Sequence, residues 1–164
     1  MTQDLTIRPA CPGDLPRMKQ IAVRAWEPIY AGYVARMGEE LFSLLHPDGW
    51  QDEKAGQVAD HFQEWPEWCL VSELNGQVVG FITFVLKHAQ KIGEIGNNAV
   101  DPDYQGRGIG SAQYRHVLEL FRDKGMVYAE VCTGLDEAHA PARAAYKKVD
   151  FKLTVPKGTY YRKL

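Results

Sequence analysis

Residues 105–111 read QGRGIGS, and this glycine-rich stretch is the first clue to what the chain binds. It follows a strand-like run at 92–100 that ends at the turn sequence Asp101-Pro102-Asp103, and it precedes a run with helical spacing. Three glycines between a strand and a helix favour an anion site, because the free N–H groups of the first helical turn converge with the positive end of the helix dipole. We therefore expect a phosphate group to bind here.

The spacing of the glycines indicates which class of phosphate-containing ligand the site would bind. An ATPase phosphate loop ends in Gly-Lys-Ser/Thr, whereas Gly110 is followed by Ser-Ala. The sequence also lacks the dinucleotide-binding pattern GxGxxG, because only one residue separates Gly106 from Gly108 and Gly108 from Gly110. The pattern that fits is Gln/Arg-x-x-Gly-x-Gly/Ala, beginning at Gln105. So short a pattern recurs by chance, and the rest of the chain must decide.

Hydrophobic periodicity gives the order of the other elements. We expect strands at 5–8, 68–74, 77–87, 92–100 and 126–132, a closing hairpin at 151–155 and 159–163, and helices at 14–29, 39–45, 53–64, 108–124 and 138–148. Asn75-Gly76 is a strong signal for a two-residue hairpin turn, and Asp14 is a candidate N-cap. The expected fold is α/β (α+β): a single mixed, mostly antiparallel twisted sheet of about six to seven strands flanked by helices.

Length and composition suit an ordinary globular protein. The 164 residues fit one domain, residues 1–164, and with 45% hydrophobic and 24% charged residues can bury a sizeable core. A net charge of −2 implies no general affinity for nucleic acid or anionic membranes. Three widely spaced cysteines suggest neither a disulfide framework nor a metal site. Without a signal-like or membrane-spanning apolar run, we expect a cytoplasmic protein.

Several motifs together resemble one family. The run EIGNNAVDPDYQGRGIGS at 94–111 resembles the central cofactor motif of the GCN5-related N-acetyltransferases, the GNAT superfamily. Ala142, Tyr146 and Phe151 resemble that family's second motif, Asn-x-x-Ala-x-x-x-Tyr-x-x-x-Gly-Phe, and segments 7–14 and 75–81 resemble its first strand and helix and its central hairpin. The resemblance covers about residues 5–155. It implies transfer of an acetyl group from the thioester of acetyl-CoA to a primary amine.

Two positions depart from the second motif. His139 stands where Asn is usual, and Asp150 stands where Gly is usual. Imidazole can still donate and accept a hydrogen bond, and Asp tolerates left-handed backbone angles better than most residues. Two other classes stay open: a relative that binds or senses acyl-CoA without turnover, and a nucleotide-phosphate binder unrelated to CoA.

The resemblance implies two catalytic side chains. Glu94 stands where several family members carry a catalytic glutamate, and strict alternation would place it on one strand face with Asn98 and Val100. Its alternative is a solvated carboxylate paired with Lys87 or Lys91. Asn97 and Asn98 are candidates for holding a water beside such a base. Tyr146 matches the tyrosine that donates to the departing thiolate, although it also suits the inner face of an amphipathic helix.

The resemblance also implies the binding residues. For the cofactor these are Ala99, Val100, Gln105, Gly106, Arg107, Gly108, Ile109, Gly110, Ser111, His139 and Tyr146, with the backbone N–H near Val100 as oxyanion donor. For the amine acceptor they are Trp26, Glu27 and Tyr30, since aromatic rings with an acidic group suit a cation. Trp26 and Tyr30 could equally fill the edge of the core. The acceptor stays open among a polyamine, an amino acid derivative, an aminoglycoside-like molecule and a protein amine, and a homodimer is one assembly that relatives adopt.

Overall fold

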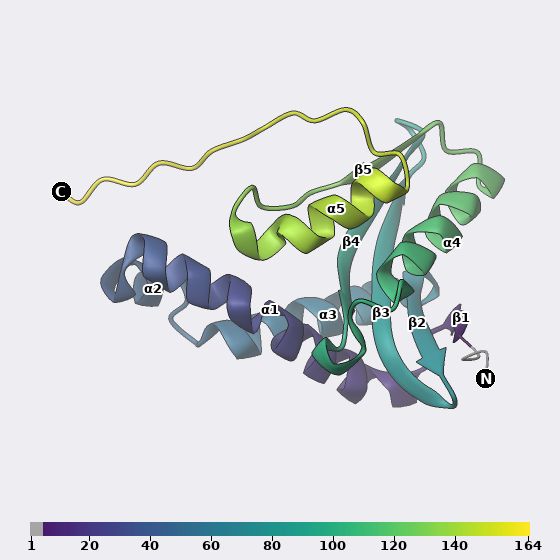
Figure 1. The fold of residues 1–164 in the computed structure, drawn as a ribbon, viewed down its shortest axis with the longest axis horizontal. Helices are drawn as coiled ribbons and strands as arrows, with labels where there is room; N and C mark the ends of the chain where they lie inside the picture. The colour runs from purple at the N-terminus through teal and green to yellow at the C-terminus, as the bar shows by residue number, and fades with distance from the viewer. Residues whose placement is uncertain (1–4) are drawn as a thin grey trace.

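A five-stranded sheet forms the centre of the computed structural model, which describes residues 5–164 (Figure 1). The strands are β1 (Leu5–Pro9), β2 (Cys69–Leu74), β3 (Gln77–Lys87), β4 (Ile92–Val100) and β5 (Tyr128–Val131). They lie in the order β1-β2-β3-β4-β5, antiparallel except for the parallel pair β4 and β5. The expected mixed, mostly antiparallel sheet is therefore confirmed, but it has five strands and not six to seven.

Helices cover both faces of the sheet. They are α1 (Leu15–Met37), α2 (Glu39–Leu45), α3 (Trp50–Glu64), α4 (Ile109–Asp123) and α5 (Ala140–Lys148). Single 3-10 turns lie at Pro12–Asp14, Pro66–Trp68, Pro102–Tyr104 and Glu137–His139. α1 and α3 pack on one face of the sheet, and α4 and α5 pack on the other (Figure 1). Within residues 5–164 no helix is both long and apolar enough to cross a membrane.

Successive side chains of β3 point alternately into the two core layers. Phe81 points toward Met18 and Ile21 of α1, whereas Ile82 and Phe84 point toward α4 and α5. Burying a side chain of this size contributes about 1.5–3 kcal/mol. Because both faces of the central strands are covered, β2 and β3 read as nearly continuous apolar runs.

The predicted turn at Asn75-Gly76 is confirmed. Asn75 has φ of 50° and Gly76 has φ of 80°, the positive angles that a type I′ hairpin requires at both central residues. The prediction for Asp14 holds only in position, since α1 begins directly after it. Its side chain does not cap α1, and instead accepts hydrogen bonds from Arg8 Nη1 at 2.7 Å and from the Cys11 N–H at 2.8 Å.

The predicted closing hairpin is wrong. Residues 151–164 contain no strand, and the chain runs away from the end of α5 as an extended segment (Figure 1). Leu153, Val155 and Tyr160 are more than four fifths exposed. Their β propensity indicated strands, but a two-stranded hairpin needs a packed apolar face to be stable, and this segment has none.

Candidate active site

The parallel strands β4 and β5 separate halfway along β4. They pair only between Ile92–Ile95 and Tyr128–Val131, so that beyond Ile95 one edge of β4 has no strand beside it. The Asp101 N–H donates to Val79 O at 2.8 Å. Because successive residues of a strand direct their backbone groups to opposite sides, the N–H and C=O of Val100 point away from β3 and into the opening. An extended ligand could pair with this edge.

A β-bulge lies in the same half of β4. Thr83 of β3 faces both Gly96 and Asn97, and its hydroxyl donates to Asn97 O at 3.1 Å. The extra residue breaks the alternation, since Glu94 pairs with Val85 and Asn98 pairs with Ile82. The expectation that Glu94 shares a face with Asn98 and Val100 is therefore wrong. Glu94 and Asn97 face α1 and α3, whereas Asn98 faces α4 and α5.

The opening forms a cleft of about 1220 Å³. Its walls come from α1, α3, the second half of β4, the loop to α4, the start of α4, and the region from Cys132 to Lys148. Of the predicted site residues, it brings together Trp26, Glu27, Glu94, Ala99, Val100, Gln105, Gly106, Gly108, Ile109, Gly110, Ser111, His139 and Tyr146. Arg107 and Tyr30 do not line it.

The glycine-rich loop ends at the uncapped start of α4. Gly108 is the N-cap and has φ of 80°, a left-handed angle that glycine adopts without strain. The first helical bond runs from Ala112 N–H to Gly108 O at 3.0 Å, so the N–H groups of the residues between them have no partner within the helix. Arg107 turns aside: its Nη2 donates to Asp103 O at 3.1 Å and its guanidinium lies 5.0 Å from the Tyr104 ring.

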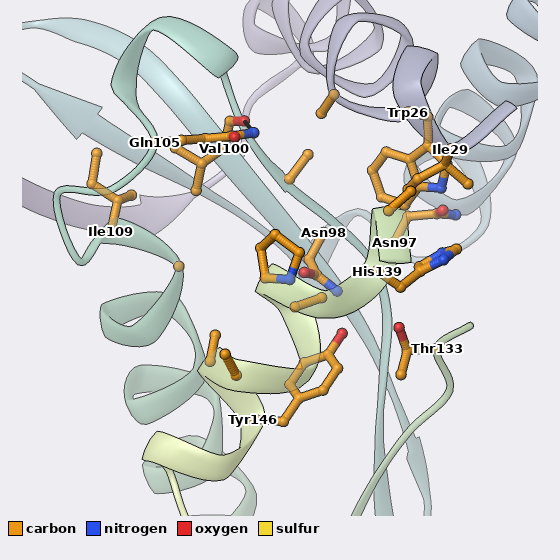
Figure 2. Close-up of a pocket in the computed structure, with 18 of the residues that line it drawn as sticks. Trp26, Ile29, Asn97, Asn98, Val100, Gln105, Ile109, Thr133, His139 and Tyr146 are labelled. Atoms are coloured by element: carbon orange, nitrogen blue, oxygen red, sulfur yellow. Dashed lines mark hydrogen bonds between the residues drawn. The ribbon is translucent and has the colours of Figure 1, made fainter. Parts of the chain in front are cut away.

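Tyr146 of α5 lies on the other side of the opening. Figure 2 shows its hydroxyl directed toward Asn98 and Thr133. Its ring lies 5.0 Å from that of Tyr114, whose hydroxyl donates to Asn98 Oδ1 at 2.6 Å. Burial raises the pKa of Tyr146 above its ordinary value, which hydrogen bonds to Tyr114, Asn98 and Thr133 oppose. The phenol is therefore protonated at neutral pH and can donate a proton.

The carboxylate of Glu94 is paired within the protein. It forms an ion pair with Lys87, whose Nζ also lies 3.0 Å from Glu130 Oε2. This arrangement matches the alternative interpretation, a strand carboxylate paired with lysine. The side chain is 36% exposed and lines the cleft, so water reaches it.

The predicted acceptor residues divide between the cleft and the core. Trp26 and Glu27 line the cleft, whereas Tyr30 is 7% exposed and stacks on Trp50 with ring centroids 4.3 Å apart. The structure adds a wall residue that sequence reasoning missed, Lys54 of α3, together with Tyr114 and Thr133. The helical spacing of α3 marks Lys54 only as a polar position, so no local signal identifies it.

A model of the acetyltransferase (GNAT) family matches residues 35–151, which include the splayed half of β4, the glycine-rich loop and Tyr146. The chain belongs to this family. Among curated GNAT relatives, the N-alpha-acetyltransferase RimI of Mycobacterium tuberculosis is 42% identical over 69 residues, 42% of this chain and 40% of that protein. The peptidyl-lysine N-acetyltransferase YjaB of Escherichia coli is 31% identical over 97 residues, 59% of this chain and 56% of that protein. The chain thus spans about 40–60% of the length of these relatives.

Solved GNAT structures share the fold across the whole sheet. The PaiA N-acetyltransferase of Thermoplasma acidophilum, solved in complex with coenzyme A, has a TM-score of 0.68 over 94% of each chain at 17% identity. At that identity the likeness concerns the fold alone.

The structure shows the local backbone and hydrogen bonds of the two residues that depart from the second GNAT motif. Asp150 has φ of 70°, the left-handed angle for which glycine is usual. His139 lies at the start of α5, where its Nδ1 is 2.7 Å from Asp136 Oδ2 and its N–H donates to Asp136 Oδ1 at 3.2 Å. Asp136 thus orients the imidazole at the wall of the cleft.

Proposed function

We propose that this chain transfers the acetyl group of acetyl-CoA to a primary amine by direct attack. One observation carries the proposal: the unpaired edge of β4 lies in a single cleft, between the uncapped N-terminus of α4 and the hydroxyl of Tyr146. An anion site, a backbone edge and a proton donor in that order suit a long thioester with a pyrophosphate at one end.

The donor substrate is assigned to the loop and the strand edge. The pyrophosphate would take the N–H groups of residues 105–111, where the dipole of α4 favours negative charge. The pantetheine amides would pair with the backbone N–H and C=O of Val100, and Ala99 would contact the cofactor as its neighbour in the cleft wall. Val100 O accepts from Gln105 Nε2 at 3.0 Å, outside the sheet, and a carbonyl oxygen has a second lone pair for a pantetheine amide. Gly110 has open space around its Cα, the nearest atom to an added Cβ being Val100 Cγ2 at 3.8 Å.

The reaction needs one proton removed from the amine and one given to sulfur. The neutral amine attacks the thioester carbonyl carbon, and the backbone N–H of Val100 stabilises the oxyanion. The C–S bond then breaks, and the departing thiolate takes a proton from Tyr146. The proton that the attacking nitrogen loses would pass through a water to Glu94 and from there to solvent, and the phenolate of Tyr146 regains a proton from solvent. The products are the N-acetylated amine and free CoA.

Glu94 remains the proposed base, acting through a water. For this role its carboxylate must leave Lys87 or share that ion pair with the water. Replacement Glu94→Gln tests this directly, since an unchanged pH–rate profile would remove Glu94 from the mechanism. The Lys87→Met variant should instead free the carboxylate.

The acceptor is proposed to be an amine of a small molecule or a peptide. Two relatives, an N-alpha-acetyltransferase and a peptidyl-lysine N-acetyltransferase, support an amine acceptor of either size. The net charge of −2 supports an acceptor other than nucleic acid or a membrane surface. A cytoplasmic protein with a single domain over residues 1–164 belongs to the same proposal. A homodimer is part of the same proposal.

The test is an amine panel incubated with acetyl-CoA, with mass detection of acetylated products and a thiol assay for free CoA. Product from at least one amine class, together with equal release of CoA, is the expected result. A melting temperature that acetyl-CoA raises without any product would indicate a binding or sensing module. A melting temperature that ATP raises and acetyl-CoA does not would contradict the family's donor in this chain.

A further inference from the structure

A buried lysine forms one wall of the cleft. Lys54 of α3 is 5% exposed, and its Nζ donates to Asn97 Oδ1 at 2.6 Å and to Gln57 Oε1 at 3.2 Å. The same Nζ lies 3.9 Å from the centroid of the Trp26 ring. All three partners are neutral, and Trp26, Asn97 and Lys54 itself line the cleft.

No carboxylate neutralises this ammonium within residues 5–164. Glu53, beside it on α3, is held by His46 Nδ1 at 2.6 Å, Glu94 on β4 is paired with Lys87, and Glu27 on α1 is exposed. Burial lowers the pKa of Lys54 to about 8, so the group is still mostly protonated at neutral pH. A buried charge held only by neutral groups costs stability. Such a local conflict is expected where a ligand completes the site.

The position of Lys54 relative to the reacting groups fits an acceptor. Asn97, which holds its ammonium, directly precedes Asn98, which accepts from Tyr114 beside Tyr146. The bulge turns Asn97 to the face of α1 and α3, whereas Asn98 and Tyr146 lie on the face of α4 and α5. Figure 2 shows Trp26 and Asn97 grouped at one end of the cleft, away from the loop residues Gln105 and Ile109. The donor groups thus occupy one side, and the end at Lys54 is left for the acceptor.

We propose that Lys54 binds a carboxylate of the acceptor, so that the substrate class is a small primary amine that also carries a carboxylate, such as an amino acid. The ammonium of Lys54 supplies the charge, and Trp26 beside it covers the aliphatic part of the ligand. Polyamines and aminoglycoside-like acceptors are disfavoured, because their like charge would meet an uncompensated buried cation. This inference rests on the proposed function and names the substrate of the same site.

The experiment compares matched acceptors on matched variants. Each amino acid is paired with its carboxamide and with the amine that remains after decarboxylation, and product formation from acetyl-CoA is followed by mass. The proteins are the wild type, Lys54→Met and Lys124→Met, the last being an exposed lysine at the end of α4 outside the cleft. Lys54→Gln serves as a second variant that keeps a polar group if Lys54→Met does not fold.

We expect the wild type and Lys124→Met to favour the acids over both neutral partners by about 30-fold or more in kcat/KM. Lys54→Met should raise KM for the acids by a similar factor, with a smaller change in kcat, and should leave KM for the decarboxylated amines unchanged. A structural role of Lys54 would change both substrate series equally.

Three outcomes overturn the inference. Equal use of acids and decarboxylated amines by the wild type would show that no carboxylate is bound. An unchanged KM for acids in Lys54→Met would show that another group binds it. An acetyl group found on Lys54 itself after incubation with acetyl-CoA alone would make Lys54 the acceptor. If no amine of any kind is acetylated, the proposed function fails and this inference fails with it, a result distinct from the other three.

Discussion

Asp101 and Lys54 are both buried charges that face α1, but only Asp101 is neutralised by the protein. The Asp101 side chain is fully buried, and its two oxygens accept from Arg24 Nη1 and Arg17 Nη2, each at 2.6 Å. Lys54 is nearly as buried, and its partners among residues 5–164 are neutral. Asp101 thus stabilises the fold, whereas we propose that a bound ligand neutralises the charge of Lys54.

Asp101 also positions the glycine-rich loop. It is the N-cap of the turn Pro102–Tyr104, and its Oδ1 accepts from the Asp103 N–H at 3.0 Å. The two arginines come from α1, so the carboxylate joins that helix to the end of β4. The loop at 105–111 therefore begins from a fixed point.

The largest expected effect on stability follows from removing the carboxylate of Asp101, which two arginines neutralise. Asp101→Ala leaves Arg17 and Arg24 without their shared partner and removes the cap, so we expect a loss of about 3 kcal/mol in the free energy of unfolding. Chemical denaturation at pH 7 measures it. The variant should also bind acetyl-CoA more weakly, which isothermal titration checks. A loss under about 1 kcal/mol would contradict a stabilising role of Asp101, because the residue would then contribute no more than a surface ion pair.

The opposite change in the free energy of unfolding is expected when the charge of Lys54 is removed. Lys54→Met replaces a buried ammonium by an apolar side chain of similar length, and we expect stability to stay equal or to rise by about 2 kcal/mol in the absence of substrate. The same denaturation series measures it. Loss of stability in Lys54→Met would mean that the hydrogen bonds to Asn97 and Gln57 outweigh the cost of desolvation.

The pH dependence of stability tests the buried charge of Lys54 further. The pKa of Lys54 is about 8 in the folded protein and 10.5 in its ordinary state, so between these values the unfolded chain holds a proton that the folded chain has lost. Stability conferred through this group therefore rises with pH across that window. The stability advantage of Lys54→Met over the wild type should shrink between pH 8 and pH 10. A constant difference would contradict a buried, titrating ammonium.

The smallest effect is expected at the exposed rim of the Asp101 cluster. Asp103 is 70% exposed and pairs with Arg24 Nη2 at 3.0 Å. Asp103→Ala should cost less than about 1 kcal/mol, because exposed ion pairs contribute little. A cost equal to that of Asp101→Ala would show that burial does not set the difference between the two carboxylates.

Local sequence predicted the strand, loop and helix around the glycine-rich stretch well. A strand, a turn, three glycines and a helix are encoded within 92–124, and each step depends on neighbours in the chain. β4 and the turn at Asn75-Gly76 were predicted residue by residue, since alternation and turn chemistry act over a few positions. The tail beyond Phe151 failed because strand propensity does not reveal whether a packing partner exists.

Features made by distant contacts could not be predicted in the same way. The bulge at Gly96 and Asn97 depends on pairing with Thr83, and it reversed the face assigned to Glu94. Tyr30 stacks on Trp50, which helical spacing within α1 cannot indicate. The bond from Lys54 to Asn97 joins residues 43 positions apart, so the proposed acceptor end of the cleft forms only in the folded chain.

The proposed acetyl transfer in this cleft depends on Tyr146 as the proton donor to sulfur. The most direct measurement is the rate of acetylated product from the best amine of the panel, for the wild type and Tyr146→Phe, alongside the affinity of each for acetyl-CoA. We expect a kcat about 100-fold lower in Tyr146→Phe with nearly unchanged affinity. Equal kcat in the two proteins would contradict it.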